Sequence, residues 1–213
     1  MDELRVTEIF YSLQGESRTV GWPTVFVRLT GCPLRCVYCD TSYAFSGGEK
    51  QSITGILETV ANYRPRFVCV TGGEPLAQKA CLRLLSALAD AGYEVSLETS
   101  GAIDVSEVDH RVSKVMDLKT PSSQEAHRNL WGNLDSLNSN DQVKFVIMDE
   151  SDYEWSVEQV RKYDLAQRCE VLFSPAMGYQ NPTALADMIL RDRLPVRFQL
   201  QLHKLLWGNA QGK

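Results

Sequence analysis

Residues 31–41 read Gly-Cys-Pro-Leu-Arg-Cys-Val-Tyr-Cys-Asp-Thr and place Cys32, Cys36 and Cys39 in the spacing C-x3-C-x2-C. The apolar run before them, residues 25–29, predicts a β-strand. Thiolates at this density favour soft or borderline metal ions, so an iron–sulfur cluster and zinc are the candidates. Structural zinc sites and ordinary four-iron clusters both take four protein ligands, but no further Cys or His follows before residue 69. The trio therefore indicates a cluster with one iron left open, with a partial zinc site or three unrelated thiols as the alternative.

The length of 213 residues predicts a single domain spanning residues 1–213, long enough to bury a substantial core. The formal net charge of −5 argues against direct binding to nucleic acid. The first ten residues carry acids where a signal peptide carries basic residues, and no apolar stretch reaches membrane-spanning length. We therefore expect a cytoplasmic protein without membrane contact, in which Cys69, Cys81 and Cys169 are buried thiols.

Strand-like and helix-like segments alternate along most of the chain. Residues 6–12 predict a short strand, and about seven further β-rich runs begin at Val25, the later ones at 66–75, 93–101, 113–121, 141–148, 170–175 and 196–202. Helices are predicted at 53–63, 78–91, 131–138, 153–163 and 183–191. Such alternation indicates parallel strands with helical crossovers. A complete eight-fold barrel takes about 250 residues, so the expected fold is α/β, a partial (incomplete) TIM-like barrel with covering helices.

Polar motifs follow several of the predicted strands. The cysteine loop follows the first strand, Thr-Gly-Gly-Glu-Pro at 71–75 ends the second, and Glu-Thr-Ser-Gly at 98–101 ends the third. The carboxyl ends of parallel barrel strands meet at one mouth, where such folds place their chemistry. Glycines let the backbone approach a ligand closely, and a carboxylate complements a cation. The motifs therefore predict one site at this mouth.

The spacing C-x3-C-x2-C, with Tyr38 before the last cysteine and Gly-Gly-Glu-Pro downstream, resembles the signature of the radical S-adenosylmethionine (SAM) enzymes. The resemblance implies a partial barrel in which Cys32, Cys36 and Cys39 hold a [4Fe-4S] cluster whose open iron is chelated by SAM. It assigns to SAM binding Tyr38, Cys39, Asp40, Gly73, Glu74, Gly101, Asn140, Asp141, Gln142, Gln180, Asn181, Pro182 and Thr183. For 140–142 and 180–183, ordinary turns are an equal alternative.

Two further motifs, Ser-Leu-Gln-Gly-Glu at 12–16 and Gln-Leu-His-Lys-Leu-Leu-Trp-Gly-Asn at 201–209, extend the resemblance from about residue 9 to residue 209. They are similar to the radical SAM enzymes of queuosine and 7-deazapurine biosynthesis. That branch contracts the ring of 6-carboxy-5,6,7,8-tetrahydropterin to 7-carboxy-7-deazaguanine, with loss of ammonia. One departure is Ser17, where that branch usually has glycine after Gln-Gly-Glu, so the detailed shape of the pocket is open.

This resemblance implies a substrate site made of Leu13, Gln14, Gly15, Glu16, Arg28, Thr99 and Lys213. The residue types suit a pterin, because Gln14 can pair with its amide edge, Glu16 can accept from its donors and Arg28 can grip a carboxylate bidentately. Thr41 resembles the position whose hydroxyl ligates Mg2+, with a loop cap as the alternative. His203 is expected to be structural, with a place in the pocket lining or at a dimer contact as the alternative.

The resemblance also implies a homodimer, to which the apolar tail at 205–207 could contribute, and an electron donor such as flavodoxin or ferredoxin. Two alternatives remain open from the sequence. One is another radical SAM enzyme, a glycyl-radical activase, which would need an exposed groove for its protein partner. The other is a non-catalytic module that stores an iron–sulfur cluster.

Overall fold

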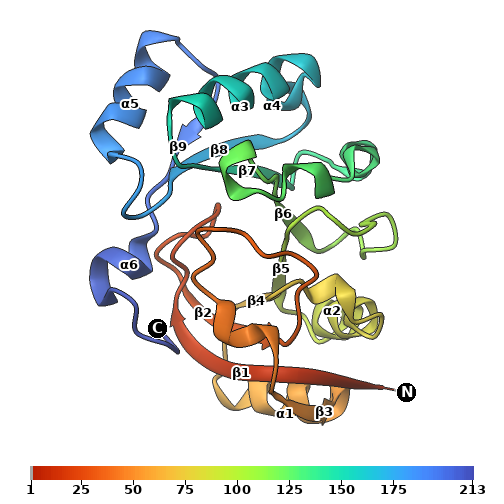
Figure 1. The fold of residues 1–213 in the computed structure, drawn as a ribbon. Coiled ribbons are helices and arrows are strands. Elements are labelled where there is room, and N and C mark those ends of the chain that lie inside the picture. The colour runs from red at the N-terminus through yellow and green to blue at the C-terminus, as the bar shows by residue number, and fades with distance from the viewer. Residues whose placement is uncertain (1) are drawn as a thin grey trace.

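The computed structural model describes residues 2–213, which form one nine-stranded sheet in the order β3-β1-β2-β4-β5-β6-β7-β8-β9. The strands are β1 (Glu3–Leu13), β2 (Pro23–Leu29), β3 (Glu49–Ser52), β4 (Phe67–Gly72), β5 (Glu94–Thr99), β6 (Ser113–Asp117), β7 (Gln142–Ile147), β8 (Glu170–Pro175) and β9 (Arg197–Phe198). From β2 to β9 every neighbouring pair is parallel, whereas β1 pairs antiparallel with β2 and β3. The sheet curves without closing (Figure 1), so the predicted partial barrel with seven parallel strands is confirmed.

The crossovers carry the helices α1 (Ile53–Asn62), α2 (Cys81–Asp90), α3 (Glu150–Lys162), α4 (Leu165–Arg168) and α5 (Pro182–Arg191), and α6 (Leu202–Trp207) follows the last strand. The predicted helix starts have physical causes, since the Ser52 side chain accepts from the backbone N–H of Gly55 at the start of α1. At α5, Asn181 caps the helix in the same way and Pro182 takes the first position. Within residues 2–213, no helix is long and apolar enough to cross a bilayer.

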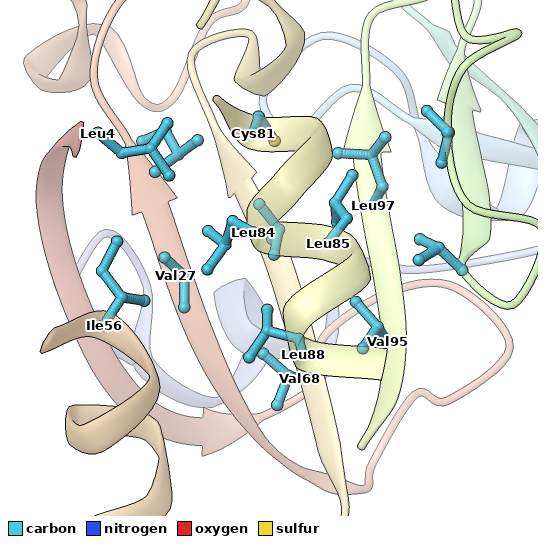
Figure 2. Close-up of a cluster of buried hydrophobic side chains, with 14 of the residues drawn as sticks. Leu4, Val27, Ile56, Val68, Cys81, Leu84, Leu85, Leu88, Val95 and Leu97 are labelled. Atoms are coloured by element: carbon cyan, nitrogen blue, oxygen red, sulfur yellow. The ribbon is translucent and has the colours of Figure 1, made fainter. Parts of the chain in front are cut away.

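The core lies between the sheet and its covering helices. In Figure 2, α2 turns Leu84, Leu85 and Leu88 onto the side chains of β2, β4 and β5, and all three are fully buried. A second cluster joins β7 and β8 to α3 and α5. Burying each such side chain contributes roughly 1.5–3 kcal/mol. This packing fixes the strands whose carboxyl ends carry the polar motifs.

Two predicted helices differ in the structure, and one strand was not predicted. The helix predicted from residue 78 begins at Cys81, because Pro75–Ala77 forms a separate 3-10 turn. The segment 131–138 is a 3-10 helix, Trp131–Ser136, rather than an α-helix. Its buried Asn133 donates to the carbonyls of Gly101 and Ile103, and these bonds to a distant loop fix its path. Strand β3 was not predicted, because Glu-Lys-Gln-Ser has no apolar alternation and serves only as a sheet edge.

Candidate active site

A cavity opens at the carboxyl ends of β2, β4, β5 and β6, with β7 forming part of its wall. Fourteen of the predicted site residues line it together: Leu13, Gln14, Gly15, Glu16, Arg28, Cys32, Cys36, Tyr38, Cys39, Asp40, Thr41, Gly73, Thr99 and Lys213. They come from both termini and from three strand ends. The structure therefore brings the predicted cluster loop and the predicted substrate residues to one space.

The cysteine loop is held by backbone hydrogen bonds on both sides. The N–H of Gly31 donates to the carbonyl of Ala44 at 2.8 Å, and the N–H of Glu74 donates to the carbonyl of Gly31 at 2.8 Å. At the far end of the loop, the N–H of Arg35 donates to the Glu125 carboxylate at 2.6 Å. These bonds tie the loop to the Gly-Gly-Glu-Pro turn and to the segment after β6, so its path is fixed without a ligand.

The three loop cysteines are free, half-buried thiols, while Cys69, Cys81 and Cys169 are buried away from the cavity. Burial raises the pKa of Cys36 to about 11, to which the charges of Asp117 and Cys39 add, so a cluster must displace the thiol proton when it binds. Among residues 2–213, no three His, Cys, Asp or Glu side chains surround a point that could hold a single metal ion. A four-iron cluster needs no such point, because each thiolate ligates a different iron. The donor set fits a cluster with one iron free for a ligand in the cavity.

Two glycines bring the Gly-Gly-Glu-Pro turn against the cysteine loop. Gly72 has φ +152°, and a Cβ there would lie 2.2 Å from the carbonyl oxygen of Leu29. A Cβ on Gly73 would lie 2.3 Å from the carbonyl oxygen of Gly31 and 2.7 Å from the Cβ of Cys32. The glycines are therefore required for close contact between the two motifs.

Glu74 does not occupy the place predicted for it. Its side chain is fully buried and does not line the cavity. Its carboxylate accepts from the Thr99 hydroxyl at 2.9 and 3.0 Å, from the Ser100 N–H at 2.7 Å and hydroxyl at 2.5 Å, and from the Leu76 N–H at 3.0 Å. With these donors in place, the carboxylate ties the turn to the end of β5. Glu74, which the resemblance assigns to SAM binding, therefore lies behind the cavity wall, and Gly73, Thr99 and Ser100 face the cavity.

The predicted SAM residues Asn140, Asp141 and Gln142 lie at the other end of the barrel. They precede and begin β7, so they sit at its amino end, and Asp141 forms an ion pair of 3.0 Å with Lys114 there. The same polar residue types form turns at the amino and at the carboxyl end of a strand, so the sequence pattern did not show at which end of β7 these residues lie.

Two further predicted SAM contacts stay outside the cavity. Gln180, Asn181, Pro182 and Thr183 form the start of α5, where capping accounts for the residue types. Gly101, with φ +70°, packs on the Met116 side chain, and its carbonyl accepts from Leu130 and Asn133.

The Gln-Gly-Glu loop is closed by the C-terminal segment. The N–H of Leu202 donates to the carbonyl of Gly15 at 2.9 Å, and Gly15 has no room for a Cβ because it would lie 2.1 Å from Nδ1 of His203. His203 lines the cavity, which was the alternative to a purely structural role, and burial lowers its pKa. Lys204 pairs with Asp40 of the cysteine loop at 2.8 Å. The tail thus completes the wall between the two predicted subsites.

Ser17, the departure from the resembled pattern, adopts φ +67°, a conformation that glycine reaches more readily. Its N–H donates to the Gln199 side chain at 2.8 Å, and Gln199 donates back to the Ser17 carbonyl at 3.0 Å. The Ser17 side chain is not part of the cavity lining. The substitution therefore leaves the polar groups of the cavity in place.

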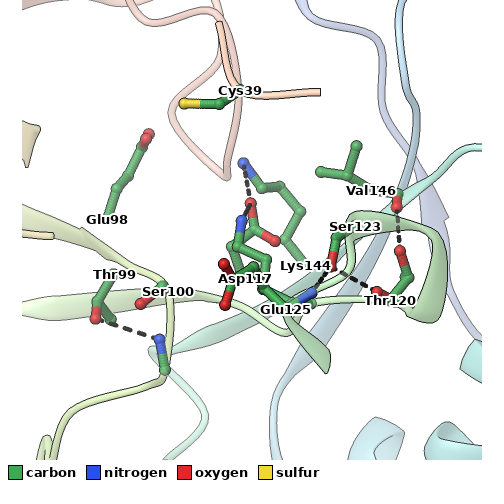
Figure 3. A network of polar contacts seen from close by, with 12 residues as sticks. Cys39, Glu98, Thr99, Ser100, Asp117, Thr120, Ser123, Glu125, Lys144 and Val146 are labelled. Atoms are coloured by element: carbon green, nitrogen blue, oxygen red, sulfur yellow. Dashed lines mark hydrogen bonds and ion pairs between the residues drawn. The ribbon is translucent and has the colours of Figure 1, made fainter. Parts of the chain in front are cut away.

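An ion pair at the floor of the cavity joins Glu16 to β7. Lys144 Nζ lies 2.6 Å from Glu16 Oε2 and 3.4 Å from Asp117 Oδ2, and Gln201 donates to Glu16 Oε1 at 2.7 Å. Figure 3 shows Lys144 and Asp117 side by side. Burial raises the pKa of Glu16, but the Lys144 charge and hydrogen bonds outweigh it and lower the pKa to about 2. Glu16 is therefore ionised and directed by its partners.

The Glu16 carboxylate should make stability depend on acid pH. Its pKa falls on folding from an ordinary 4.5 to about 2, so its contribution is complete above about pH 4.5 and is lost as the pH falls to about 2. The shift corresponds to on the order of 3 kcal/mol. We expect the gap in unfolding free energy between wild type and Glu16→Gln to close over that window, as measured by urea unfolding. Exposed Glu107→Gln is the control, and a gap that stays constant with pH would contradict the assignment.

Arg28 is fixed from behind by a second network. Its Nε donates to Glu8 Oε1 at 2.7 Å, and the Tyr43 hydroxyl donates to the same oxygen at 2.8 Å. The guanidinium lies 5.7 Å from the Phe10 ring centre and 5.8 Å from that of Tyr43, within cation–π range. The cavity-lining guanidinium is thus held on its Nε side, an arrangement suited to an anionic group.

Several cavity residues escaped the sequence reasoning. They are Lys144, Gln201 and Lys204, whereas Thr71, Glu98, Ser100, Asp117 and Lys119 lie in polar motifs at the ends of predicted strands. A charged residue inside an otherwise apolar strand, as in Gln-Val-Lys-Phe-Val-Ile, was the available signal for Lys144. Gln14 Nε2 and Asp117 Oδ1 are buried without a hydrogen-bond partner in the described chain, and both residues line the cavity, where a ligand could pair with these atoms.

The comparisons with known proteins agree with this geometry. The Radical SAM superfamily profile matches residues 26–164. A 7-carboxy-7-deazaguanine synthase of Chlorobaculum tepidum is 44% identical over 98% of this chain and 97% of its own, and one of Koribacter versatilis is 41% identical over 96% and 97%.

Solved structures show the same fold at low identity. QueE from Escherichia coli superimposes with a TM-score of 0.80 over 94% of this chain and 95% of its own, at 22% identity. SuiB of Streptococcus suis, bound to SAM, gives 0.56 over 80% of this chain and 45% of its own, at 15% identity. With the fold, the cysteine loop and relatives matched over almost their whole length, the chain belongs to the Radical SAM superfamily and, within it, to the family of 7-carboxy-7-deazaguanine synthases.

Proposed function

We propose that this chain converts 6-carboxy-5,6,7,8-tetrahydropterin to 7-carboxy-7-deazaguanine with loss of ammonia, in 7-deazapurine biosynthesis. The observation that carries the proposal is one cavity that combines the three-cysteine loop with Gln14, Glu16 and Arg28. The family's curated members bear the name of that reaction. A pterin presents an aminopyrimidinone edge and a carboxylate, which those three side chains complement.

At the cysteine end of the cavity, Cys32, Cys36 and Cys39 would hold the [4Fe-4S] cluster, Tyr38, Gly73 and Ser100 would contact SAM, and Thr99 would face the substrate. When bound, the cluster and SAM supply a one-electron cleavage that yields a carbon radical able to abstract hydrogen from the substrate. The surrounding residues keep the two ligands adjacent and exclude water, because the tail and the Gln-Gly-Glu loop close the wall.

At the other end, the buried and unpartnered Nε2 of Gln14 would donate to the pterin carbonyl, and ionised Glu16 would accept from its amino group. Arg28 would bind the carboxylate. Because Glu8 and Tyr43 already hold the Arg28 guanidinium, little side-chain entropy is lost on binding.

Arg28→Lys should raise the KM for the pterin about tenfold to a hundredfold, because lysine keeps the charge but not the planar fork. SAM cleavage without pterin should stay at the wild-type rate. Arg66→Lys, in an exposed ion pair with Glu94, is the control. Steady-state kinetics of product formation measures the effect, and an unchanged KM would remove Arg28 from the substrate site.

Thr41 is proposed as the protein ligand of Mg2+. It lines the cavity, and its Oγ1 lies 3.8 Å from Cys39 Sγ. Magnesium takes few protein ligands and completes its octahedron with substrate oxygens and water. Thr41→Val, which replaces the hydroxyl by a methyl group, should raise the Mg2+ concentration for half-maximal activity at least about tenfold. Thr59→Val on α1 is the control, and an unchanged Mg2+ titration would refute the assignment.

The deciding experiment is mass spectrometry of an anaerobic reaction of cluster-loaded protein, reductant, SAM, Mg2+ and 6-carboxytetrahydropterin. Formation of 7-carboxy-7-deazaguanine supports the proposal. Formation of 5'-deoxyadenosine alone would reject the substrate, and formation of neither would favour cluster storage. A homodimer, a flavodoxin or ferredoxin electron donor and a cytoplasmic location complete the proposal.

A further inference from the structure

Lys144 is a charged residue of the cavity to which the proposed function assigns no contact with a ligand. Lys144 lies in the middle of β7, between the apolar residues Val143 and Phe145, and is 7% exposed. A buried ammonium is costly unless it is paired and hydrogen-bonded. Its closest partner is Glu16, 128 residues earlier in the chain, at 2.6 Å. The pair therefore connects the barrel wall to the loop that would read the pterin.

The groups that face this pair come from several elements. Glu16 is approached by Lys144 and by His203 and Gln201 of the tail. Lys144 is approached by Glu16, by Asp117 of β6 and by Glu98 of β5, and the field of Arg28 reaches Glu98. Lys119 Nζ lies 3.1 Å from Asp117 Oδ2, the same oxygen that Lys144 approaches at 3.4 Å. Lys144 is thus the cation in direct contact with Glu16, and its charge is what favours the ionised carboxylate there.

The protonation state of Glu16 decides which hydrogen bonds it can make. An ionised carboxylate only accepts, whereas a protonated carboxyl group can also donate. Gln201 already donates to Oε1, and Lys144 donates to Oε2. A ligand amino group can therefore donate a hydrogen bond to the Glu16 carboxylate. A ligand carbonyl in the same position would place one acceptor oxygen against another, which is unfavourable.

We propose that Lys144 is a specificity-determining positioning residue, which keeps Glu16 an acceptor so that the cavity selects a 2-amino pterin over the 2-oxo lumazine of the same shape. This inference rests on the proposed function. Without Lys144, only the Gln201 hydrogen bond and the field of His203 oppose the effect of burial on Glu16. Burial then favours the neutral carboxyl group, which can donate to the 2-oxo group. The choice between amino and oxo ligands then becomes weak and dependent on pH.

The test is equilibrium binding of two non-reacting, oxidised probes, 6-carboxypterin and 6-carboxylumazine, to cluster-loaded protein with SAM. Wild type should prefer the pterin by about a hundredfold or more at neutral pH, because a site built for a donor rejects an analogue that lacks it. Lys144→Met should bind the pterin about tenfold to a hundredfold more weakly. Its preference should fall to within about tenfold and recover as the pH rises.

Two variants separate this role from general damage. Lys114→Met removes another buried ammonium, which pairs with Asp141 at 3.0 Å outside the cavity, and should keep the wild-type preference. Lys144→Arg retains the cation and should retain most of the preference. If Lys144→Met does not fold, the double variant Glu16→Gln, Lys144→Met takes its place, because it removes both charges of the pair and leaves neither buried alone. It should bind both probes with similar affinity at every pH.

The outcomes are distinguishable. A folded Lys144→Met protein with the wild-type preference at every pH overturns the inference while leaving the proposed function intact. A double variant that still prefers the pterin as strongly as wild type overturns it as well. Wild-type protein that binds both probes equally overturns the inference alone. Wild-type protein that binds neither probe rejects the proposed substrate and the inference with it.

Discussion

Replacing Cys32, Cys36 or Cys39 by alanine is expected to abolish SAM cleavage, with formation of 5'-deoxyadenosine falling to background. Each thiol lines the cavity and supplies one of the three protein ligands proposed for the cluster. Among the described residues, the other cysteines are buried elsewhere and cannot substitute without refolding. The loss should therefore be complete for each position rather than graded.

The measurement pairs product analysis with the iron and sulfide content and visible absorbance of the reconstituted protein. Cys81→Ala is the matched control, because Cys81 is a fully buried thiol at the start of α2, outside the cavity. It should lose some stability but bind the cluster normally. A loop variant that folds, as judged by circular dichroism, and still cleaves SAM at the wild-type rate would refute the cluster assignment.

The parts of the site carried by local sequence were predictable. The cysteine loop was recognised from the spacing of three cysteines after a strand. The Gly72–Gly73 turn was recognised from two adjacent glycines, which allow the backbone to approach a neighbouring segment closely. The parallel sheet followed in the same way from the alternation of strand-like and helix-like segments. Each of these features can be recognised from a short stretch of sequence.

The parts set by long-range contacts were not predictable. Glu74 looked like a ligand-binding acid, but Thr99 and Ser100 from the next strand occupy its oxygens. The partnership of Lys144 with Glu16 spans most of the chain, and nothing in either local sequence announces the other. Only the folded barrel brings these side chains together. The sequence pattern therefore identified the motifs but not the residues that they contact.

Gly73→Ala should lower SAM cleavage by about a hundredfold or more, although it changes none of the three proposed cluster ligands. The new Cβ would lie 2.3 Å from the Gly31 carbonyl oxygen and 2.7 Å from the Cβ of Cys32, so the turn or the cysteine loop must move. The turn is the less free of the two, because the buried Glu74 carboxylate is anchored to Thr99 and Ser100. The cysteine loop is therefore expected to shift, which also weakens the bond from the Glu74 N–H to the Gly31 carbonyl.

The expected cost in stability is modest, about 1–3 kcal/mol, because overpacking at one position can be relieved locally. Activity should fall much further, since a cluster ligand that is misplaced by about an ångström misaligns SAM with the substrate. Gly132→Ala is the control, because a Cβ at Gly132 has no neighbouring atom within 4 Å. Measured 5'-deoxyadenosine formation, with iron content and thermal unfolding recorded on the same samples, separates misalignment from unfolding. If Gly73→Ala cleaved SAM at the wild-type rate, the close packing of the two motifs would not be needed for the reaction, and positioning of SAM would have to come from the rest of the cavity.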